Sequence, residues 1–147
     1  MAEQAQATAE TGPRPIVPFL KLGAEPHLVG TKCSCGAVFL DTKRIACSKC
    51  GSTGPFETVR LSTRGKVYVF SVVHQSFPGI KTPYITAIVD LPEGVSVRTN
   101  LVDLDPLAVE KDPKQLFDMP VEMTTQVVAK DRQGNDVVAF AFRPIKH

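Results

Sequence analysis

The amino-acid sequence predicts a mostly β protein, in which a small cysteine-rich module precedes a five-stranded closed barrel. Three observations carry this prediction. All four cysteines lie between residues 30 and 56. Five later segments combine β-branched and aromatic residues and are separated by turn-forming residues. The helix-compatible stretch among them, 105–119, is interrupted by two prolines. A chain of 147 residues has room for one domain or for two small ones.

The overall composition excludes several classes of protein. With 43% hydrophobic and 22% charged residues, the chain has enough apolar material for a core, which excludes a wholly disordered protein. It has no apolar run of the roughly 18 residues that a membrane-spanning helix needs, and we expect no membrane partner. The net charge of +2, from 17 basic and 15 acidic residues, is too small to attract nucleic acid by itself.

The first 29 residues divide by composition into a tail and an apolar segment. Residues 1–18 begin with small polar residues and end in a proline-rich stretch, and we expect a flexible tail there. The start of the chain lacks the basic and hydrophobic regions of a secretory signal, which favours the reducing cytoplasm. Residues 19–29 are apolar but contain Gly23 and Pro26, so we expect a short helical segment or turn. This segment can dock on the protein's own core or on a partner.

The four cysteines form two pairs with the spacing of a zinc ribbon. Cys33 and Cys35 are separated by one residue, Cys47 and Cys50 by two, and eleven residues lie between the pairs. In a reducing compartment, such pairs are better explained as metal ligands than as disulfides. In a zinc ribbon each pair lies on a turn, so that the four thiolates meet tetrahedrally around the metal. A glycine follows each pair and permits the positive φ that such a turn often needs. Zinc is the predicted metal, with an iron site or a redox pair as the alternatives.

Four protein ligands fill the coordination sphere, so the predicted zinc is structural and has no position open to water or substrate. From residue 32 to residue 60 the sequence carries five basic and two acidic residues, a formal charge of +3. Zinc with four thiolates contributes about −2, which these basic residues offset. Contact with phosphate or nucleic acid is the alternative role of these cations.

The barrel is predicted over residues 61–147, after an N-terminal segment and ribbon over residues 19–60. One or two short helical turns are expected within 105–119, between the third and fourth strands. Five strands with such an insertion are typical of an OB-fold barrel. The expected strands are residues 66–73, 84–89, 95–101, 121–128 and 137–142.

The sequence contains none of the motifs that mark common catalytic sites. No Gly-x-Ser-x-Gly elbow, Walker loop or Gly-x-Gly-x-x-Gly fingerprint is present. His27 stands before the ribbon, His74 at the end of an expected strand, and His147 is the last residue. For each of them, a surface role is favoured over that of a catalytic base. No residues compose a nucleophile, a base and an orienting group, so we expect no catalytic residues in this chain.

Beyond the cysteine pairs, the sequence carries short motifs in a fixed order: Leu28-Val-Gly-Thr-Lys-Cys33, Leu61-Ser-Thr-Arg-Gly-Lys-Val67, Pro83-Tyr84, Val89-Asp-Leu-Pro-Glu-Gly94, Met119-Pro-Val121 and Phe140-Ala-Phe-Arg-Pro144. From about residue 19 to residue 144, their order and spacing resemble a family of acyl-CoA-associated proteins that join a rubredoxin-type zinc ribbon to an OB-fold. Two features depart from the family pattern. The first cysteine pair is one residue shorter, and the loop before Cys47 contains Thr42-Lys43-Arg44 in place of a proline-rich version.

The resemblance implies a function that is exerted through a partner. Members of the family are assembled with thiolases or related acyl-CoA enzymes, and the ribbon–OB chain is the non-catalytic subunit while the partner carries the catalytic cysteine. The resemblance therefore implies an accessory subunit of a thiolase-type acyl-CoA C-acyltransferase complex. Structural zinc and CoA or acyl-CoA shared with the partner would be its cofactors.

Two features of the barrel sequence indicate where contacts with a partner and with CoA lie. Residues 67–73 are apolar at alternate positions on both faces, so the outer face of this strand is covered by the ribbon, by the N-terminal segment or by another protein. The connection over residues 75–82 carries Phe77 and Lys81, and we expect Lys81 or Arg64 to meet a CoA phosphate. A plain solvated loop is the alternative for this connection.

A nucleic-acid-binding module is the competing class, because ribbons and OB-folds serve there as well. Such a barrel needs aromatic stacking platforms and a basic groove. Aromatic residues make up only 7% of this sequence, tryptophan is absent, and residues 61–147 carry ten basic and ten acidic residues. Nucleic acid is therefore disfavoured as a partner. A redox or metal-delivery protein is a third class, which a closed four-ligand site disfavours.

Overall fold

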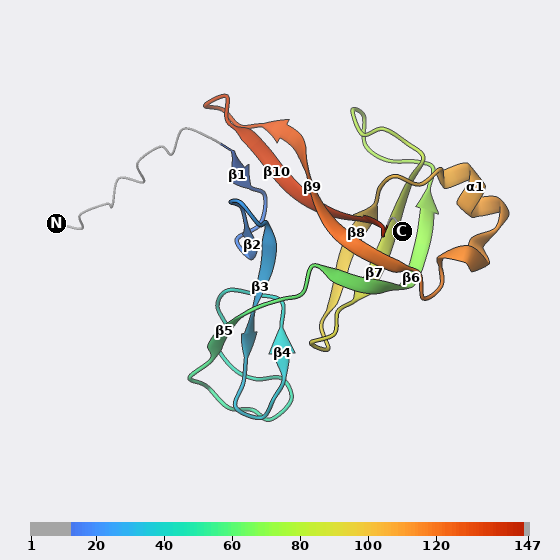
Figure 1. Cartoon of the computed structure of the whole chain (residues 1–147). Coiled ribbons are helices and arrows are strands. Elements are labelled where there is room, and N and C mark those ends of the chain that lie inside the picture. The colour runs from blue at the N-terminus through green and yellow to red at the C-terminus, as the bar shows by residue number, and fades with distance from the viewer. Residues whose placement is uncertain (1–12, 146–147) are drawn as a thin grey trace.

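The computed structural model describes residues 13–145 and shows a β-barrel with a smaller β module beside it (Figure 1). The strand β6 pairs with both β7 and β9, β8 pairs with β7, and β10 pairs with both β8 and β9, which closes the barrel. This order confirms the predicted OB-fold, with its short helices between the third and fourth strands. The elements are β6 (Arg64–Val73), β7 (Tyr84–Asp90), β8 (Ser96–Leu101), α1 (Pro106–Lys111), the 3₁₀ helix η1 (Pro113–Leu116), β9 (Pro120–Lys130) and β10 (Asp136–Pro144).

The barrel elements follow from local sequence. β8 buries Val97, Thr99 and Leu101 and exposes the residues between them, as expected for a strand with one face on a core. The helix α1 begins after Asp105, whose side chain accepts a hydrogen bond from the backbone N–H of Leu107 at 3.0 Å. The helices in the described part of the chain span six and four residues, and neither is long and apolar enough to cross a membrane.

The cysteine-rich module is a four-stranded antiparallel sheet. Its strands are β2 (Leu20–Lys21), β3 (His27–Lys32), β4 (Val38–Phe39) and β5 (Glu57–Arg60), and β3 pairs with the other three. Of the helical segment or turn expected over residues 19–29, the helix is wrong and a bend is present, because β2 and the start of β3 form a hairpin there. Gly23, with φ of 143°, and Pro26, which has no N–H, favour the intervening bend over a helix.

A short strand at the start of the described chain extends the barrel sheet. β1 (Arg14–Pro15) pairs in parallel with β10, and the N–H of Ile16 donates to the carbonyl of Val138 at 2.8 Å. The Arg14 guanidinium also contacts the Asp131 carboxylate at 2.9 Å. Residues 1–12 of the expected tail lie outside the described residues.

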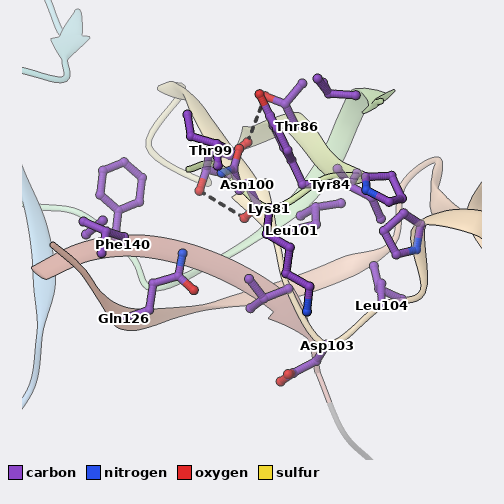
Figure 2. Close-up of a pocket in the computed structure, with 18 of the residues that line it drawn as sticks. Lys81, Tyr84, Thr86, Thr99, Asn100, Leu101, Asp103, Leu104, Gln126 and Phe140 are labelled. Atoms are coloured by element: carbon purple, nitrogen blue, oxygen red, sulfur yellow. Dashed lines mark hydrogen bonds between the residues drawn. The ribbon is translucent and has the colours of Figure 1, made fainter. Parts of the chain in front are cut away.

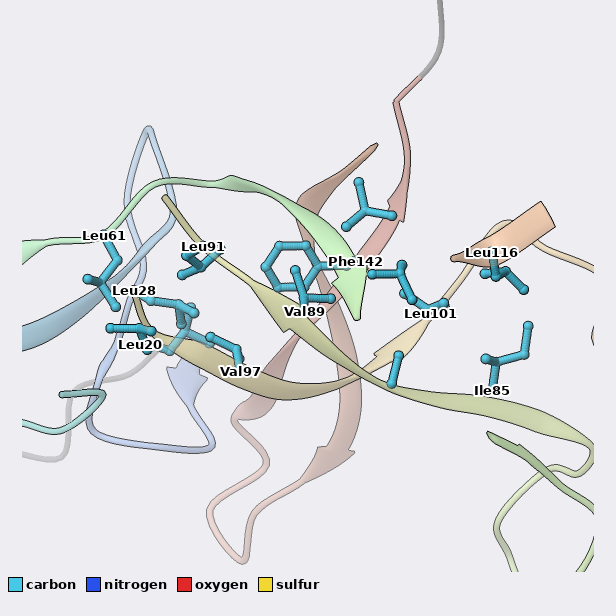
Figure 3. Packing of buried hydrophobic residues seen from close by; sticks show 14 of the residues in the cluster. Leu20, Leu28, Leu61, Ile85, Val89, Leu91, Val97, Leu101, Leu116 and Phe142 are labelled. Atoms are coloured by element: carbon cyan, nitrogen blue, oxygen red, sulfur yellow. The ribbon is translucent and has the colours of Figure 1, made fainter. Parts of the chain in front are cut away.

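The ribbon and the barrel contribute to one hydrophobic core. Leu20, Leu28 and Leu61 are almost completely buried in the same cluster as Phe142 of β10. Figure 3 shows these leucines at one end of the barrel interior and Leu116 of η1 at the other. The N-terminal apolar segment therefore docks on the protein's own core, where it closes one end of the barrel.

A β-bulge explains why both faces of β6 are apolar. The register between β6 and β7 shifts between Val67 and Val69, so that one extra residue stands in β6. Val67 is buried and Phe70 packs against the core, whereas Tyr68 and Val69 remain 61% and 42% exposed. The expected cover by the ribbon or the N-terminal segment is absent at these two described residues.

Candidate metal centre

The four cysteines converge at one end of the ribbon. Cys33 directly follows β3, Cys35 precedes β4, and Cys47 and Cys50 lie in the loop between β4 and β5. The four Sγ atoms lie within 4.8 Å of one another, with 3.6 Å between Cys33 and Cys50 and 3.7 Å between Cys35 and Cys47. A tetrahedral zinc with Zn–S bonds of about 2.3 Å requires sulfur–sulfur distances of about 3.8 Å. The spacing of the thiols therefore fits a metal ion with four sulfur ligands.

Each cysteine pair lies on a turn that its glycine completes. The N–H of Gly36 donates to the carbonyl of Cys33, and the N–H of Gly51 donates to the carbonyl of Cys47, both at 2.9 Å. Gly36 and Gly51 have φ angles of 95° and 78°. These values confirm the positive φ expected after each pair, which a residue with a Cβ adopts only at a cost.

Backbone amides favour the thiolate forms of Cys33 and Cys47. The N–H of Cys50 and then that of Lys49, each 3.4 Å from the Cys47 sulfur, lower the pKa of Cys47 to about 6. The pKa of Cys33 is lowered, mainly by a backbone hydrogen bond from Cys35. An amide of Ser52 also favours the thiolate of Cys50, but the neighbouring thiols outweigh it and raise the pKa of Cys50 to about 12. Four adjacent thiolates repel one another, and a divalent cation is the group that relieves this repulsion.

The side chain of Arg44 connects the sheet of the ribbon to the second cysteine loop. Its guanidinium lies 3.4 Å from the centroid of the Phe39 ring and 2.8 Å from a carboxylate oxygen of Asp41. A second guanidinium nitrogen donates to the Ser48 hydroxyl at 3.3 Å, next to Cys47. Arg44 belongs to the loop that departs from the family pattern, and its contacts therefore hold this loop against the sheet of the ribbon. Sequence reasoning missed this role, because only the fold places Phe39 beneath Arg44.

Lys81 lines a groove of about 1160 Å³ beside the β6–β7 connection. Residues of the β6–β7 connection, β7, β8, β9 and β10 form its walls, and Ile16 adds an apolar side chain next to β1. Figure 2 shows Lys81 among the polar side chains Thr86, Asn100 and Gln126, which come from three different strands. The groove combines apolar walls with polar groups, the cationic side chains of Lys81 and Arg98 and the carboxylate of Asp103.

Arg64 lies elsewhere on the barrel. It lines a separate groove of about 440 Å³ together with Asp90, Asp118 and Ile145, and this groove shares no lining residue with the first. The structure therefore does not bring Arg64 and Lys81 to one site.

Comparisons with known proteins agree with the fold. A family profile described as the C-terminal OB-fold domain of ChsH2 matches residues 58–126. A solved structure of the Ltp2-ChsH2(DUF35) aldolase aligns with a TM-score of 0.60 and 30% sequence identity, over 80% of this chain and 84% of that chain.

Relatives of known name align over both the ribbon and the barrel. A DUF35 domain-containing scaffold protein of Methanocaldococcus jannaschii is 34% identical over 126 residues, which are 82% of this chain and 83% of the relative. The benzoylsuccinyl-CoA thiolase subunit BbsA of Geobacter metallireducens is 35% identical over 132 residues, 88% of this chain and 83% of that subunit. With this fold, this four-thiol cluster and these relatives, the chain belongs to the DUF35/ChsH2 family of OB-fold proteins.

Proposed function

We propose that this chain is a non-catalytic, zinc-binding accessory subunit of a thiolase-type acyl-CoA C-acyltransferase, in a cytoplasmic hetero-oligomer. The observation that carries this proposal is the 35% identity to a thiolase subunit over 88% of the chain, across both the ribbon and the barrel. Benzoylsuccinyl-CoA thiolase, from anaerobic toluene degradation, is the specific complex that we propose.

The chemistry of such a complex is reversible thiolysis of a β-ketoacyl-CoA. A thiolate of the catalytic subunit attacks the keto carbonyl, the adjacent carbon–carbon bond breaks, and the departing carbanion is protonated to leave one acyl-CoA. The thiol of free CoA then attacks the acyl-thioester on the partner's cysteine, which releases the second acyl-CoA and restores the thiol. The accessory chain would support assembly and help to form the acyl-CoA pocket.

Reconstitution tests this function. The purified chain, a candidate thiolase subunit from the same genome and their mixture are assayed for cleavage of benzoylsuccinyl-CoA and simpler β-ketoacyl-CoA esters. We expect activity mainly in the mixture, and co-elution of the two chains in gel filtration. A thiolase that is fully active alone and never co-elutes with this chain would remove the proposal. Salt-sensitive retention of the chain on single-stranded DNA would then support the nucleic-acid-binding alternative.

Zinc is the metal that we propose for Cys33, Cys35, Cys47 and Cys50. Four sulfur ligands select zinc or iron, and the tetrahedral spacing of the thiols suits a structural zinc. Metal analysis of the purified protein is expected to find one zinc per chain, and less than half an equivalent would contradict this assignment. Cys47→Ser is expected to release the metal and disorder the cysteine loops, while far-UV circular dichroism shows that the barrel strands remain.

The proposal also includes a direct contact between the barrel and CoA. Lys81 is exposed at the groove described above, where an ammonium group can meet a CoA phosphate without burial of the charge. Arg64 lines the other groove, so a contact by each residue would involve different parts of the bound ligand. We expect Lys81→Ala or Arg64→Ala to raise the apparent dissociation constant of the assembled complex for acyl-CoA. If neither substitution changes it, the proposed CoA contact is wrong.

A further inference from the structure

The four cysteines of the cluster differ in their access to solvent. Cys33 and Cys47 are only 2% and 3% exposed, whereas Cys35 and Cys50 are exposed. The two exposed cysteines lie on different segments, Cys35 between β3 and β4 and Cys50 between β4 and β5. Oxidation or alkylation of a cysteine requires a thiolate that the reagent can reach. The first reaction of the cluster with a reagent from solvent is therefore confined to Cys35 and Cys50.

Backbone amides distinguish the two exposed sulfurs. A thiolate that accepts N–H hydrogen bonds is a weaker nucleophile, because its lone pairs are engaged and its charge is partly compensated. The sulfur of Cys50 accepts such a bond from the amide of Ser52. Within residues 13–145, the sulfur of Cys35 makes its hydrogen-bond contact with the sulfur of Cys47, and no backbone amide donates to it. Cys35 thus combines exposure with an unshielded sulfur.

The approach to Cys35 is also open. Its neighbours Ser34 and Gly36 are exposed, and a Cβ atom added to Gly36 would have no other atom within 4 Å. A thiolate that binds a divalent cation stays deprotonated at neutral pH and retains the form that attacks electrophiles. With the zinc that we propose for the cluster, Cys35 is therefore an accessible thiolate in neutral solution.

Cys47 is placed to react with an oxidised Cys35. The two sulfurs are 3.7 Å apart, and a disulfide requires about 2.05 Å, so the side chains need to approach by less than 2 Å. In the first step, the Cys35 thiolate attacks one oxygen of hydrogen peroxide, which gives a sulfenic acid and hydroxide. The Cys47 thiolate then attacks the sulfenic sulfur, the disulfide forms and a second hydroxide leaves. The two sulfurs together lose two electrons, and the peroxide accepts them.

We propose that the cysteine cluster is a peroxide-sensitive site, in which Cys35 reacts first and forms a disulfide with Cys47. The reaction removes two of the four metal ligands, so the ion is released and the cysteine loops lose their crosslink. The inference rests on the zinc proposed for the cluster, and it is independent of the proposed thiolase partner.

The first test identifies the cysteine that reacts first. The zinc-loaded chain is treated briefly with less than one equivalent of iodoacetamide, unfolded, blocked with a second thiol reagent and digested with trypsin. Cleavage after lysine and arginine separates Cys47 from Cys50, and fragment spectra distinguish Cys33 from Cys35 in their common peptide. We expect the first label mainly on Cys35. A label mainly on Cys50, or shared equally between Cys35 and Cys50, would overturn the proposal.

The second test follows the metal and the disulfide. Hydrogen peroxide is added to the zinc-loaded chain in the presence of a chromogenic chelator, and the linked tryptic peptides are identified by mass spectrometry. We expect about one zinc released per peroxide consumed, and a crosslink between the peptides 33–43 and 45–49. Dithiothreitol and added zinc should restore the starting state. A crosslink between the peptides 33–43 and 50–60 in its place would contradict the proposed disulfide.

Cys35→His and Cys50→His form a matched pair of variants. Each replaces an exposed thiolate with an imidazole, which is also a zinc ligand, so that four donors remain. We expect Cys35→His to slow the peroxide-dependent release of zinc by about fivefold or more, and Cys50→His to stay within about twofold of wild type. Equal slowing by the two substitutions would overturn the proposal. A wild-type chain that holds no zinc would overturn it together with the metal assignment, and leave the thiolase partnership standing.

Discussion

Arg44 shows at the scale of one residue how the ribbon compensates for a small core. A planar guanidinium can stack on an aromatic ring and donate in its own plane at the same time, which the ammonium group of lysine cannot do. Arg44 does both, on the Phe39 ring and towards Asp41 and Ser48. Asp41 also accepts a hydrogen bond from the buried Thr31 of β3. One side chain therefore ties the second cysteine loop to the central strand of the ribbon.

Substitution of this residue should loosen the metal site without removing a ligand. We expect Arg44→Ala to lower the free energy of unfolding by about 1–2 kcal/mol, from the lost stacking and hydrogen bonds. With the proposed zinc bound, its transfer to a chromogenic chelator should become faster, because the loop that carries Cys47 and Cys50 opens more often. Lys43→Ala, at the exposed neighbouring position, is the control and should match wild type. Equal transfer rates for Arg44→Ala and wild type would contradict this role.

At the scale of elements, the β9–β10 hairpin depends on the carboxylate of Asp131. One oxygen accepts hydrogen bonds from the backbone N–H groups of Asn135 and Gln133, and the other accepts one from Arg14, each at 2.9 Å. The Asn135 amide, with the Gln133 amide and the Arg14 guanidinium, holds the pKa of Asp131 below its ordinary value. The same carboxylate thus shapes the hairpin turn and holds β1 against β10.

The lowered pKa of Asp131 predicts a pH-dependent contribution to stability. A carboxylate whose pKa is lower in the folded than in the unfolded chain stabilises the fold above the unfolded value of about 4 and loses this effect as the pH falls through the folded value. The stability difference between wild type and Asp131→Asn should therefore be constant near neutral pH and shrink below about pH 4. Denaturant unfolding from pH 2 to pH 7 measures it. Arg14→Ala removes one of the three contacts and should give a smaller difference, and a difference independent of pH would contradict the assignment.

At the scale of the whole molecule, the ribbon is part of the barrel's core. Leu20 and Leu28 lie on a hairpin of the ribbon sheet, and both are fully buried in the cluster that contains Val97 and Phe142 of the barrel. Deletion of the N-terminal segment would therefore expose one end of the barrel.

The shared core predicts that a ribbon substitution destabilises the barrel. We expect Leu28→Ala to cost about 2–5 kcal/mol, as for other fully buried leucines, and to lower the protection of β7 and β8 amides in hydrogen exchange. Ile45→Ala, also on the ribbon but exposed, should cost less than about 0.5 kcal/mol. Unchanged protection in β7 and β8 after Leu28→Ala would show that the two parts are independently stable.

The five barrel strands, the helical insertion and the pairing of the cysteines into one cluster could be predicted from the amino-acid sequence. These features depend on local patterns: alternation along a strand, prolines that limit a helix, and ligand spacing on two turns. The hairpin formed by β2 and β3 was not predicted. A strand of two residues such as β2 carries no pattern that the sequence alone would show, and its pairing with β3 is stabilised mainly by the leucines that both strands place in the barrel core.

Which apolar residues are buried and which remain on the surface depends on the packing of the folded chain. Alternation in β6 predicts faces that reverse at each residue, but the bulge after Val67 places Tyr68 and Val69 on the outside together. A bulge depends on the register with a neighbouring strand, which residues 64–73 do not encode alone. The separation of Arg64 from Lys81 and the placement of Phe39 beneath Arg44 likewise depend on strand pairings between residues distant in sequence. Local patterns identify the elements, and the closure of the barrel around its core determines which side chains share a site.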